Sequence, residues 1–403
     1  MRILHTSDWH LGKNLEGFSR IEEQIKFCSD FVQLVRKENI DLLLIAGDVF
    51  DTSNPSAQAE KLFYKTLNEL CDNGKRCVFV IAGNHDNPDR LEAIRPLVEE
   101  SGAIILGYPK SKANIGNYSS FSIIEAKEGF TKLKFGTEIV NIASLPYPSE
   151  KRLNDIYYNF ADDVDIKKTY SEKIGKIFEI LEENFVENQI NIALSHIFVI
   201  GSEISDSERR IELGGSLLVD KKDLPKKSDY TALGHIHKGQ CMSKTYNAYY
   251  SGSPIQYSKN ERNTVKFVNI IDTIKHGKLK IDQLYLKNYK PIMLFNCESI
   301  DQALDICKEK QDDDIFAYFR IKTQDLIDAE DIRNMKKLMK NIVEIRPIIQ
   351  NESFDSDKQI IEINKSNISK YFIDFYRNTN DGANPNEDIV KLFNELLEDI
   401  EEE

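Results

Sequence analysis

Long apolar runs are missing from this chain of 403 residues. No run reaches the roughly 18 residues that a transmembrane helix needs, so the sequence predicts no membrane-spanning segment. The first residues place Arg2 ahead of any extended apolar stretch, which argues against a secretory signal. Internal repeats and low-complexity segments are absent as well. What remains is a globular chain whose length predicts roughly two or three domains.

Cysteine is sparse and scattered, and no two cysteines form a CxxC pair. The sequence therefore argues against a zinc site built on thiolates. It indicates reduced thiols in a cytoplasmic protein.

Basic residues are fewer than acidic ones, and the formal net charge is −13. Such a surplus argues at first against a nucleic-acid substrate, because phosphates repel acidic proteins. Its distribution weakens this argument, since residues 387–403 hold eight acidic residues and one lysine, a net charge of −7. Divalent metals bound at an active site would also reverse the local sign.

The first part of the chain alternates apolar strands with amphipathic helices. Strands are expected at 2–7, 40–46, 77–82, 190–195, 229–234, 246–252, 264–271 and 278–286, and several shorter strands separated by polar turns are expected within 118–145. Helices are expected at 21–38 and near 165–187. Another helix is expected to begin at Asn54-Pro55, with Asn54 as its cap and Pro55 at its first position. The nearly unbroken apolar runs at 40–46 and 77–82 are typical of strands buried on both faces in α/β sheets.

A change of pattern near residue 287 divides the chain into four segments. Residues 1–287 are the main α/β domain, and 288–350 follow the order strand–helix–strand–helix–strand of a small α/β domain. Residues 351–366 are a polar linker, and 367–403 are two helices around a turn. A two-helix unit this short buries its apolar faces poorly alone, so we expect it to pack on a partner.

Five short segments carry the residues with metal chemistry, and each follows an apolar strand. They are Asp8-x-His10, Gly47-Asp48-x-x-Asp51, Gly83-Asn84-His85-Asp86, Ser195-His196 and Gly234-His235-x-His237. Sites in open α/β sheets assemble outside the carboxyl ends of strands. Asp8 and His10 are two residues apart, so both side chains point the same way if the extended conformation continues. The glycines allow tight turns there.

Seven of these side chains are candidate ligands, with oxygen or nitrogen donors and no thiolate: Asp8, His10, Asp48, Asn84, His196, His235 and His237. Two ions that share Asp48 could be held by this set together with water. Such ligation favours manganese or iron over a structural zinc. Two dications and two aspartates leave a charge of about +2, which attracts a phosphodiester. The sequence therefore predicts a two-metal phosphoesterase.

His85 is a candidate for catalysis rather than for metal binding. Because it follows a candidate ligand, its side chain should project toward the substrate, as a general acid or as a stabiliser of transition-state charge. Asp51 could orient His85, or it could instead cap the following turn. His5 and His276 are assigned structural roles.

In this order the five segments resemble the calcineurin-like metallophosphoesterases. Finer features are similar to the SbcD family, the nuclease subunits of bacterial SbcCD complexes, at 3–12, 83–91, 205–209 with Gly214-Gly215, and 250–254. The resemblance spans the full length. It implies a two-sheet sandwich flanked by helices, a small α/β capping domain and a C-terminal helical pair.

The resemblance also implies an activity: 3′–5′ exonuclease action on duplex DNA and endonuclease action on single strands and hairpins, in DNA repair and recombination. The cofactors would be two divalent ions, with manganese expected and magnesium or iron as alternatives. One ion would use Asp8, His10, Asp48 and His237. The other would share Asp48 with Asn84, His196 and His235. His85 matches the catalytic histidine of the family.

Implied partners are a second copy of the chain and an SbcC-type ATPase that 367–403 would bind, unless those helices pack on the nuclease domain. DNA phosphates could contact Lys13, Arg20, Arg90 and Lys259, each of which could instead be an ordinary surface charge. Trp9 and Tyr257 could contact bases, although Trp9 could also pack beneath the site. Two other functions stay open: a small-molecule or cyclic-nucleotide phosphodiesterase, and an inactive scaffold.

Overall fold

The computed structural model describes residues 1–157, 169–205, 207–208, 217–274, 278–323 and 326–349, with isolated positions beyond 349. The chain divides into two compact units, Met1–Ile349 and Gln350–Glu403. The predicted linker 351–366 and most of the predicted helical pair 367–403 lie outside the described residues. Among the helices that the structure describes, none combines the length and the apolar character that spanning a membrane requires.

Two sheets form the centre of the first unit. The six-stranded sheet has the order β18 Lys278–Tyr285, β17 Phe267–Ile274, β1 Arg2–Thr6, β4 Leu42–Ala46, β5 Cys77–Ile81 and β6 Ala103–Leu106. The eight-stranded sheet has the order β15 Gln240–Ser243, β16 Ala248–Tyr250, β14 Tyr230–Gly234, β11 Ile190–His196, β10 Glu138–Leu145, β9 Phe130–Phe135, β8 Ser122–Lys127 and β7 Gly116–Asn117. Strands β1, β4, β5 and β6 are parallel, and so are β16, β14, β11 and β10.

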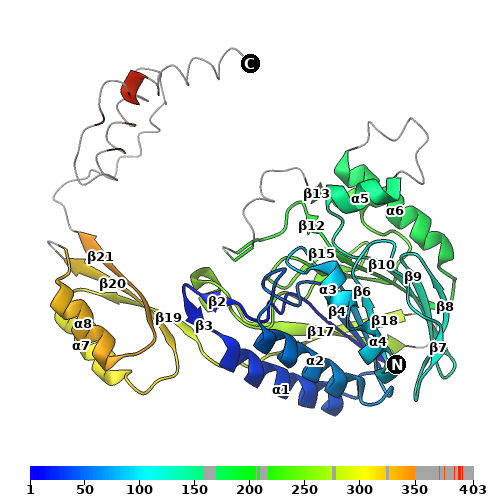
Figure 1. Ribbon diagram of the computed structural model, residues 1–403, viewed down its shortest axis with the longest axis horizontal. Helices are drawn as coiled ribbons and strands as arrows, with labels where there is room; N and C mark the ends of the chain where they lie inside the picture. Colours follow the sequence, from blue (N-terminus) through cyan, green and yellow to red (C-terminus); the bar gives the residue numbers. More distant parts are fainter. Residues whose placement is uncertain are drawn as a thin grey trace. The chain divides into compact units, whose positions relative to one another are not determined.

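The sheets pack face to face and enclose the main core. Leu42 and Leu44 of β4 pack with residues of the second sheet, whereas Leu43 and Ile45 pack with α1 Ile21–Lys37 and α2 Ala57–Cys71. Both faces of β4 are therefore buried, as its apolar run predicts. Helices α5 Glu150–Tyr157 and α6 Tyr170–Leu181 cover the outer face of the second sheet (Figure 1). The predicted α/β sandwich flanked by helices is confirmed.

Two helix starts illustrate how local sequence sets the boundaries. The predicted cap of α2 at Asn54 is wrong, because the Ser56 side chain accepts a hydrogen bond from the Ala59 amide and takes that role. The Asn54 side chain instead accepts from Arg90 Nη1 at 2.7 Å. In the region predicted helical near 165–187, α6 begins after a capping box on Thr169. Helix α5 and strand β15 were not predicted.

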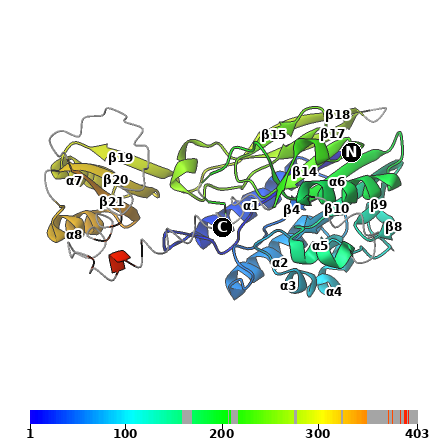
Figure 2. The ribbon, with the colours of Figure 1, turned by 90° about the horizontal axis from the view of Figure 1, so that it is seen from above.

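A third sheet follows with three parallel strands, β19 Ile292–Cys297, β20 Phe316–Thr323 and β21 Ile342–Ile349, linked by α7 Ile300–Glu309 and α8 Ala329–Leu338 (Figure 2). Residues of both helices and of the sheet form a separate core. Phe316 and Tyr318 also pack with Leu15 and Phe18 of the hairpin β2 Asn14–Leu15 and β3 Phe18–Ser19. The structure divides into compact units at 349/350 and not at 287/288, so the predicted domain boundary at 287/288 stays a prediction.

The carboxyl ends of strands from both sheets approach each other so closely that three glycines are required. A Cβ on Gly234, at the end of β14, would lie 1.7 Å from the Ala46 carbonyl oxygen at the end of β4. A Cβ on Gly47 would lie 2.4 Å from His196 Nδ1. A Cβ on Gly83 would lie 2.1 Å from Asp48 Oδ1. Only glycine fits these contacts, and they bring the five predicted segments to one place.

Candidate metal centre

The backbone at the predicted ligands is not extended. Asp8, His10, Asp48 and His235 all have positive φ angles, of 54°, 43°, 50° and 108°. The expectation that Asp8 and His10 continue an extended strand is therefore wrong. Non-glycine residues in this region cost about 1–3 kcal/mol each and persist where surrounding contacts hold them, commonly at functional sites. Here the strained residues belong to three of the five segments, and their side chains point toward one another.

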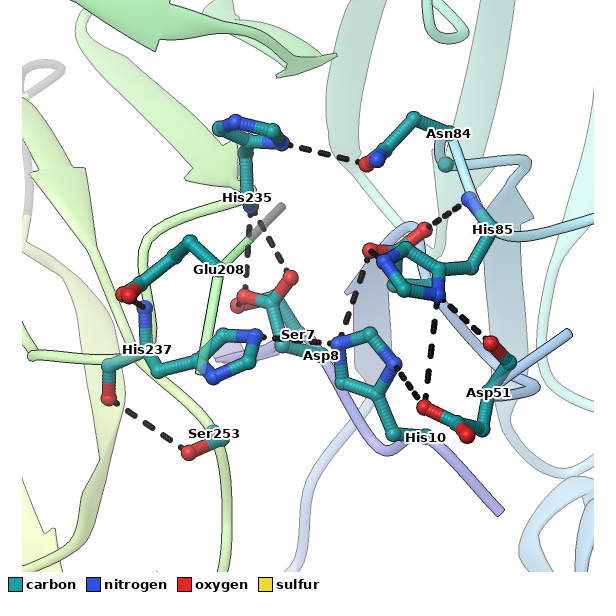
Figure 3. Close-up of polar contacts among 12 residues, drawn as sticks. Ser7, Asp8, His10, Asp51, Asn84, His85, Glu208, His235, His237 and Ser253 are labelled. Atoms are coloured by element: carbon teal, nitrogen blue, oxygen red, sulfur yellow. Dashed lines mark hydrogen bonds and ion pairs between the residues drawn. The ribbon is translucent and has the colours of Figure 1, made fainter. Parts of the chain in front are cut away.

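One group of donor atoms collects around His10 and His237. Their Nε2 atoms lie 3.0 Å apart (Figure 3). Asp48 Oδ2 lies 3.5 Å from His10 Nε2. Asp8, His10 and His237 each offer a ligand atom within 4.8 Å of the others. Asp8 is held by Ser7 Oγ, which donates to it at 2.6 Å, and by the His235 amide at 3.0 Å. The side chains of Asp8, His10, Asp48 and His237 are all buried.

A second group collects around His196. Its Nε2 lies 3.4 Å from Asp48 Oδ2, 2.8 Å from Asn84 Oδ1 and 3.3 Å from His235 Nδ1. His196 Nδ1 donates to the Ala46 carbonyl at 2.8 Å, which directs Nε2 to the site. Asp48 Oδ2 thus faces both groups, as a ligand shared by two ions would. The structure brings all seven predicted ligands together.

The charges of this cluster fit divalent cations. Burial raises the pKa of Asp8 to about 6. Burial alone would lower the pKa of His196, but the charge of Asp48 outweighs it and raises this pKa to about 9. By contrast, burial lowers the pKa of His10 to about 4, so its imidazole is neutral at pH 7 and keeps a lone pair for a metal. Two buried carboxylates with oxygen and nitrogen donors between them suit two hard or borderline cations.

His85 lies at the edge of the cluster. Its Nδ1 lies 2.5 Å from the main-chain oxygen of Asp51, whereas the Asp51 carboxylate is 4.0 Å away. Asp51 therefore orients His85 through its carbonyl group, which accepts from Nδ1–H. The Asp51 carboxylate lies 2.8 Å from Lys13 Nζ and 3.5 Å from His10 Nδ1. With Nδ1 engaged, Nε2 of His85 is the ring atom left for a substrate, 4.0 Å from Asp48 Oδ2.

A buried network behind His237 was not predicted. Ser207 Oγ lies 2.5 Å from His237 Nδ1 and donates to Glu261 Oε1 at 2.6 Å. Lys266 Nζ donates to Glu261 at 2.5 Å and to the His237 carbonyl at 2.9 Å. Because the Ser207 proton goes to the carboxylate, Ser207 accepts from His237 Nδ1–H and leaves Nε2 bare. Glu208 Oε1 accepts from the His237 amide at 3.0 Å.

Sequence spacing carries no signal for this network. Ser207 and Glu208 belong to the 205–209 loop, which was noted only as part of a family resemblance. Asp86 was likewise quoted within a motif without a role. Its carboxylate accepts from the amides of Val49, Phe50 and Gly83, and so joins the loops that follow β4 and β5. Burial raises the pKa of Asp86 to about 6.

Three predicted DNA contacts need correction. Arg20 is 1% exposed, pairs with Glu23 at 2.6 Å and donates to the Gln256 carbonyl, so it has no access to a phosphate. Trp9 is fully buried, and Tyr257, whose hydroxyl donates to the Trp9 carbonyl, is almost so. Neither ring is available for a base. Both rings pack beneath the site. For Trp9 this is the alternative role that the sequence left open.

The other three cations lie nearer the surface and have acidic partners. Lys13 pairs with Asp51, Lys259 pairs with Glu344 at 2.6 Å, and Arg90 pairs with Glu60 at 2.6 Å. Arg90 has the most exposed side chain of the three, at 40%. Their contact with DNA stays a prediction.

Comparison with known proteins agrees with this geometry. A family model described as calcineurin-like phosphoesterase matches residues 1–239. The SbcD subunit of the nuclease SbcCD from Bacillus subtilis (strain 168) is 37% identical over 405 aligned residues, which cover 100% of this chain and 99% of that protein. The chain belongs to the calcineurin-like phosphoesterases and, among them, to the SbcD family. The SbcD subunit from Staphylococcus epidermidis is 28% identical, covering 94% of each chain. That from Staphylococcus saprophyticus is 27% identical, covering 99% of each.

Membership of the SbcD family confirms the predicted family and enzyme class, a metal-dependent phosphoesterase. Together with the converging donor groups, it supports a divalent metal cofactor. The identity of the metal and the role of each ligand are matters for the proposal that follows.

Proposed function

We propose that this chain is the nuclease subunit of an SbcCD-type complex and hydrolyses DNA phosphodiester bonds with two divalent ions, manganese being preferred. The activities would be 3′–5′ exonuclease action on duplex ends and endonuclease action on single strands and hairpins. The observation that carries the proposal is that Asp48 and six other side chains with oxygen or nitrogen donors lie together, with His85 beside them. The SbcD family membership supports a polynucleotide as substrate.

The roles of the residues follow from their positions. Two divalent ions, when bound, polarise phosphoryl oxygens and activate a water for in-line attack. Asp8, His10 and His237 would hold one ion, and Asn84, His196 and His235 the other, with Asp48 between them. His85 would then donate a proton from Nε2 to the leaving oxygen, because its Nδ1 is engaged by the Asp51 carbonyl.

The assembly is part of the same proposal. Residues 367–403 would bind the coiled coil of an SbcC-type ATPase, and two copies of this chain would associate, in the cytoplasm. Residues 288–350 would act as a capping domain. The relatives are named as subunits of the nuclease SbcCD, and this supports the ATPase partner.

The decisive experiment measures cleavage of linear duplex DNA and of a DNA hairpin by the full-length chain, in manganese, magnesium or chelator, with and without an SbcC-type ATPase and ATP. A small phosphodiester, bis(p-nitrophenyl) phosphate, is assayed in parallel. We expect manganese-dependent cleavage of both DNAs, from 3′ ends on the duplex, and faster cleavage with the ATPase.

Two outcomes would contradict the proposal. Hydrolysis of the small phosphodiester without any DNA cleavage in the presence of the ATPase would favour a small-molecule phosphodiesterase. Binding of the ATPase with no hydrolysis of either substrate in any metal would favour an inactive scaffold.

A further inference from the structure

A cavity with a cationic residue in its wall lies on the His196 side of the candidate metal centre. It has a volume of about 310 Å³ and is lined by Tyr108, Pro109, Lys110, Ser111 and Arg152. The first four residues follow β6, and Arg152 lies in the first turns of α5. The sequence predicted no functional role for any of these residues. We call this cavity the Arg152 pocket.

Arg152 is the distinctive group in this pocket. Its guanidinium lies over two tyrosine rings, 5.9 Å from the centre of Tyr108 and 5.6 Å from that of Tyr147. Its Nη1 donates to the Tyr147 carbonyl at 3.0 Å. Within the part of the chain that the structure describes, no carboxylate oxygen lies within 4.0 Å of this guanidinium. Aromatic faces hold the cation without neutralising it.

Two acids that contact the wall of the cavity, Glu92 and Asp89, are engaged by other groups. Glu92 accepts from the Gly107 amide at 2.6 Å and from the Ser111 hydroxyl, and it lies 3.7 Å from Arg95. Asp89 accepts from the Tyr108 hydroxyl at 2.8 Å. Arg152 therefore keeps guanidinium N–H groups that form no ion pair within 4.0 Å among the described residues, and the buried carboxylates of Asp86 and Asp48 act on it only from farther away. An arginine in this state binds phosphate well, since its planar donors match two phosphate oxygens.

Tyr147 connects the pocket to the metal centre. Its ring lies edge-on to His196, with ring centres 6.1 Å apart, and Arg152 lies against the same ring. The Tyr147 amide donates to the Ala82 carbonyl at 2.9 Å, two residues before Asn84. The Tyr147 ring thus lies between the Arg152 guanidinium and His196, one of the predicted metal ligands. A strand whose scissile phosphate sits at Asp48 would carry a neighbouring phosphate past this position.

We propose that the Arg152 pocket binds a backbone phosphate of the polynucleotide strand, adjacent to the phosphate that is hydrolysed. The inference rests on the proposed nuclease function and adds a subsite to it. Because the neighbouring phosphate is absent from a dinucleotide but present in a longer strand, the pocket would make the enzyme favour polynucleotides over substrates with one phosphodiester. Arg152 would fix the register of the strand, as phosphate contacts generally do.

The test compares Arg152→Gln with Lys151→Gln in the full-length chain. Lys151 is an exposed neighbour on the same helix, outside the pocket, so its substitution removes an equal charge. Each protein is assayed in manganese with a dinucleotide and with a single-stranded tetranucleotide. Arg152→Gln should raise KM for the tetranucleotide about tenfold relative to its effect on the dinucleotide, because it removes a charged hydrogen bond to the second phosphate. Lys151→Gln should change this ratio less than about twofold.

A binding measurement makes the pocket testable apart from hydrolysis. Anisotropy of a labelled tetranucleotide should give about tenfold weaker binding for Arg152→Gln, with a salt slope smaller by about 0.7, the value for one single-strand phosphate contact. Arg152→Lys, which keeps the charge, should recover part of the affinity. Circular dichroism compares the folds.

Different results overturn different statements. Equal effects of Arg152→Gln on both substrates, with unchanged tetranucleotide binding, would make Arg152 a structural support for Tyr147 and overturn the pocket. Equal effects of Lys151→Gln and Arg152→Gln would also overturn it, because only general charge would then matter. A wild-type chain that binds the tetranucleotide in the predicted way but hydrolyses neither substrate would count against the proposed function and leave the pocket standing.

Discussion

The hydroxyl group of Ser207 is the most informative single perturbation at this site. Ser207 Oγ accepts from His237 Nδ1 at 2.5 Å and donates to Glu261 at 2.6 Å, so Ser207→Ala removes the group that links the two side chains. His237 Nδ1 then has no hydroxyl to accept its proton. Nothing in this network then fixes the imidazole ring in the orientation that leaves Nε2 free for a metal. Residues in this supporting position change metal affinity by about 10–100-fold, which corresponds to roughly 1.4–2.7 kcal/mol.

The expected loss is specific to one ion. His237 is grouped with His10 and Asp8, whereas the His196 group does not contact Ser207 in the described residues. Calorimetric titration of the metal-free protein with manganese should therefore resolve two sites in the wild type. In Ser207→Ala one of them should weaken about 10–100-fold, and the other should change little. Stability without metal should fall by only about 0.5–1.5 kcal/mol, the net contribution of a hydrogen bond.

Two further variants control this experiment. Ser202→Ala removes a hydroxyl five residues away that donates to the Val199 carbonyl at 2.7 Å and does not contact the site. It should leave both manganese affinities unchanged. Ser207→Thr keeps a hydroxyl and should restore most of the affinity. The reasoning fails if Ser207→Ala binds both ions as tightly as the wild type, or if Ser202→Ala weakens binding equally.

Three other substitutions test separate parts of the structure. His85→Ala should lower kcat for DNA cleavage by about 10²–10⁴-fold while manganese affinity, measured by titration, is retained; loss of metal would remove His85 from the catalytic role. Gly234→Ala, whose Cβ would meet a carbonyl at 1.7 Å, should reduce stability to urea by more than about 3 kcal/mol, whereas Gly116→Ala, with 3.5 Å of space, should cost less than about 0.5 kcal/mol. Glu261→Gln leaves Lys266 buried without its partner and should cost about 3–5 kcal/mol at pH 7. Burial alone would raise the pKa of Glu261, but Lys266 outweighs it and lowers this pKa, so the stabilisation is present above the unfolded pKa of about 4.3 and is lost as pH falls through the folded value. The stability difference between wild type and Glu261→Gln should therefore narrow below about pH 4, and a difference that grows there would contradict this sign.

Local patterns predicted most of the strands, and they pointed to side chains that the structure brings together, for a physical reason. The apolar run of β4 reports burial on both faces, and the polar residues that follow it can only lie at the end of the strand. The same patterns failed where a distant group competes for a local one. Asn54 binds Arg90, 36 residues along the chain, and Ser56 caps the helix instead. Arg20 is held in the interior by Glu23 and by the Gln256 carbonyl, 236 residues away. Neither competition leaves a trace in residue spacing.

Backbone conformation at the ligands shows the same limit. An extended continuation of β1 was a reasonable expectation for residues 8–10, yet Asp8 and His10 both have positive φ. Aspartate and histidine adopt positive φ more often than most residues, but the conformation is still uncommon for them, so residue type alone does not predict it at these positions. Hydrogen bonds from the Asp8 and His10 amides to the Gly47 and Asp48 carbonyls of the next loop hold them in place.

The sequence by itself determined the chemistry of this protein: which donor atoms exist, their order, and that each group follows a buried strand. Tertiary structure alone decided how those atoms act. The Ala46 carbonyl sets the orientation of His196 from 150 residues away, and Glu261 reaches His237 through Ser207, 54 residues before it. Such hydrogen bonds depend on how two sheets and their loops pack. Residue types are local information, whereas the distances that make a metal ligand, a positioning group or a phosphate subsite arise only when remote segments meet.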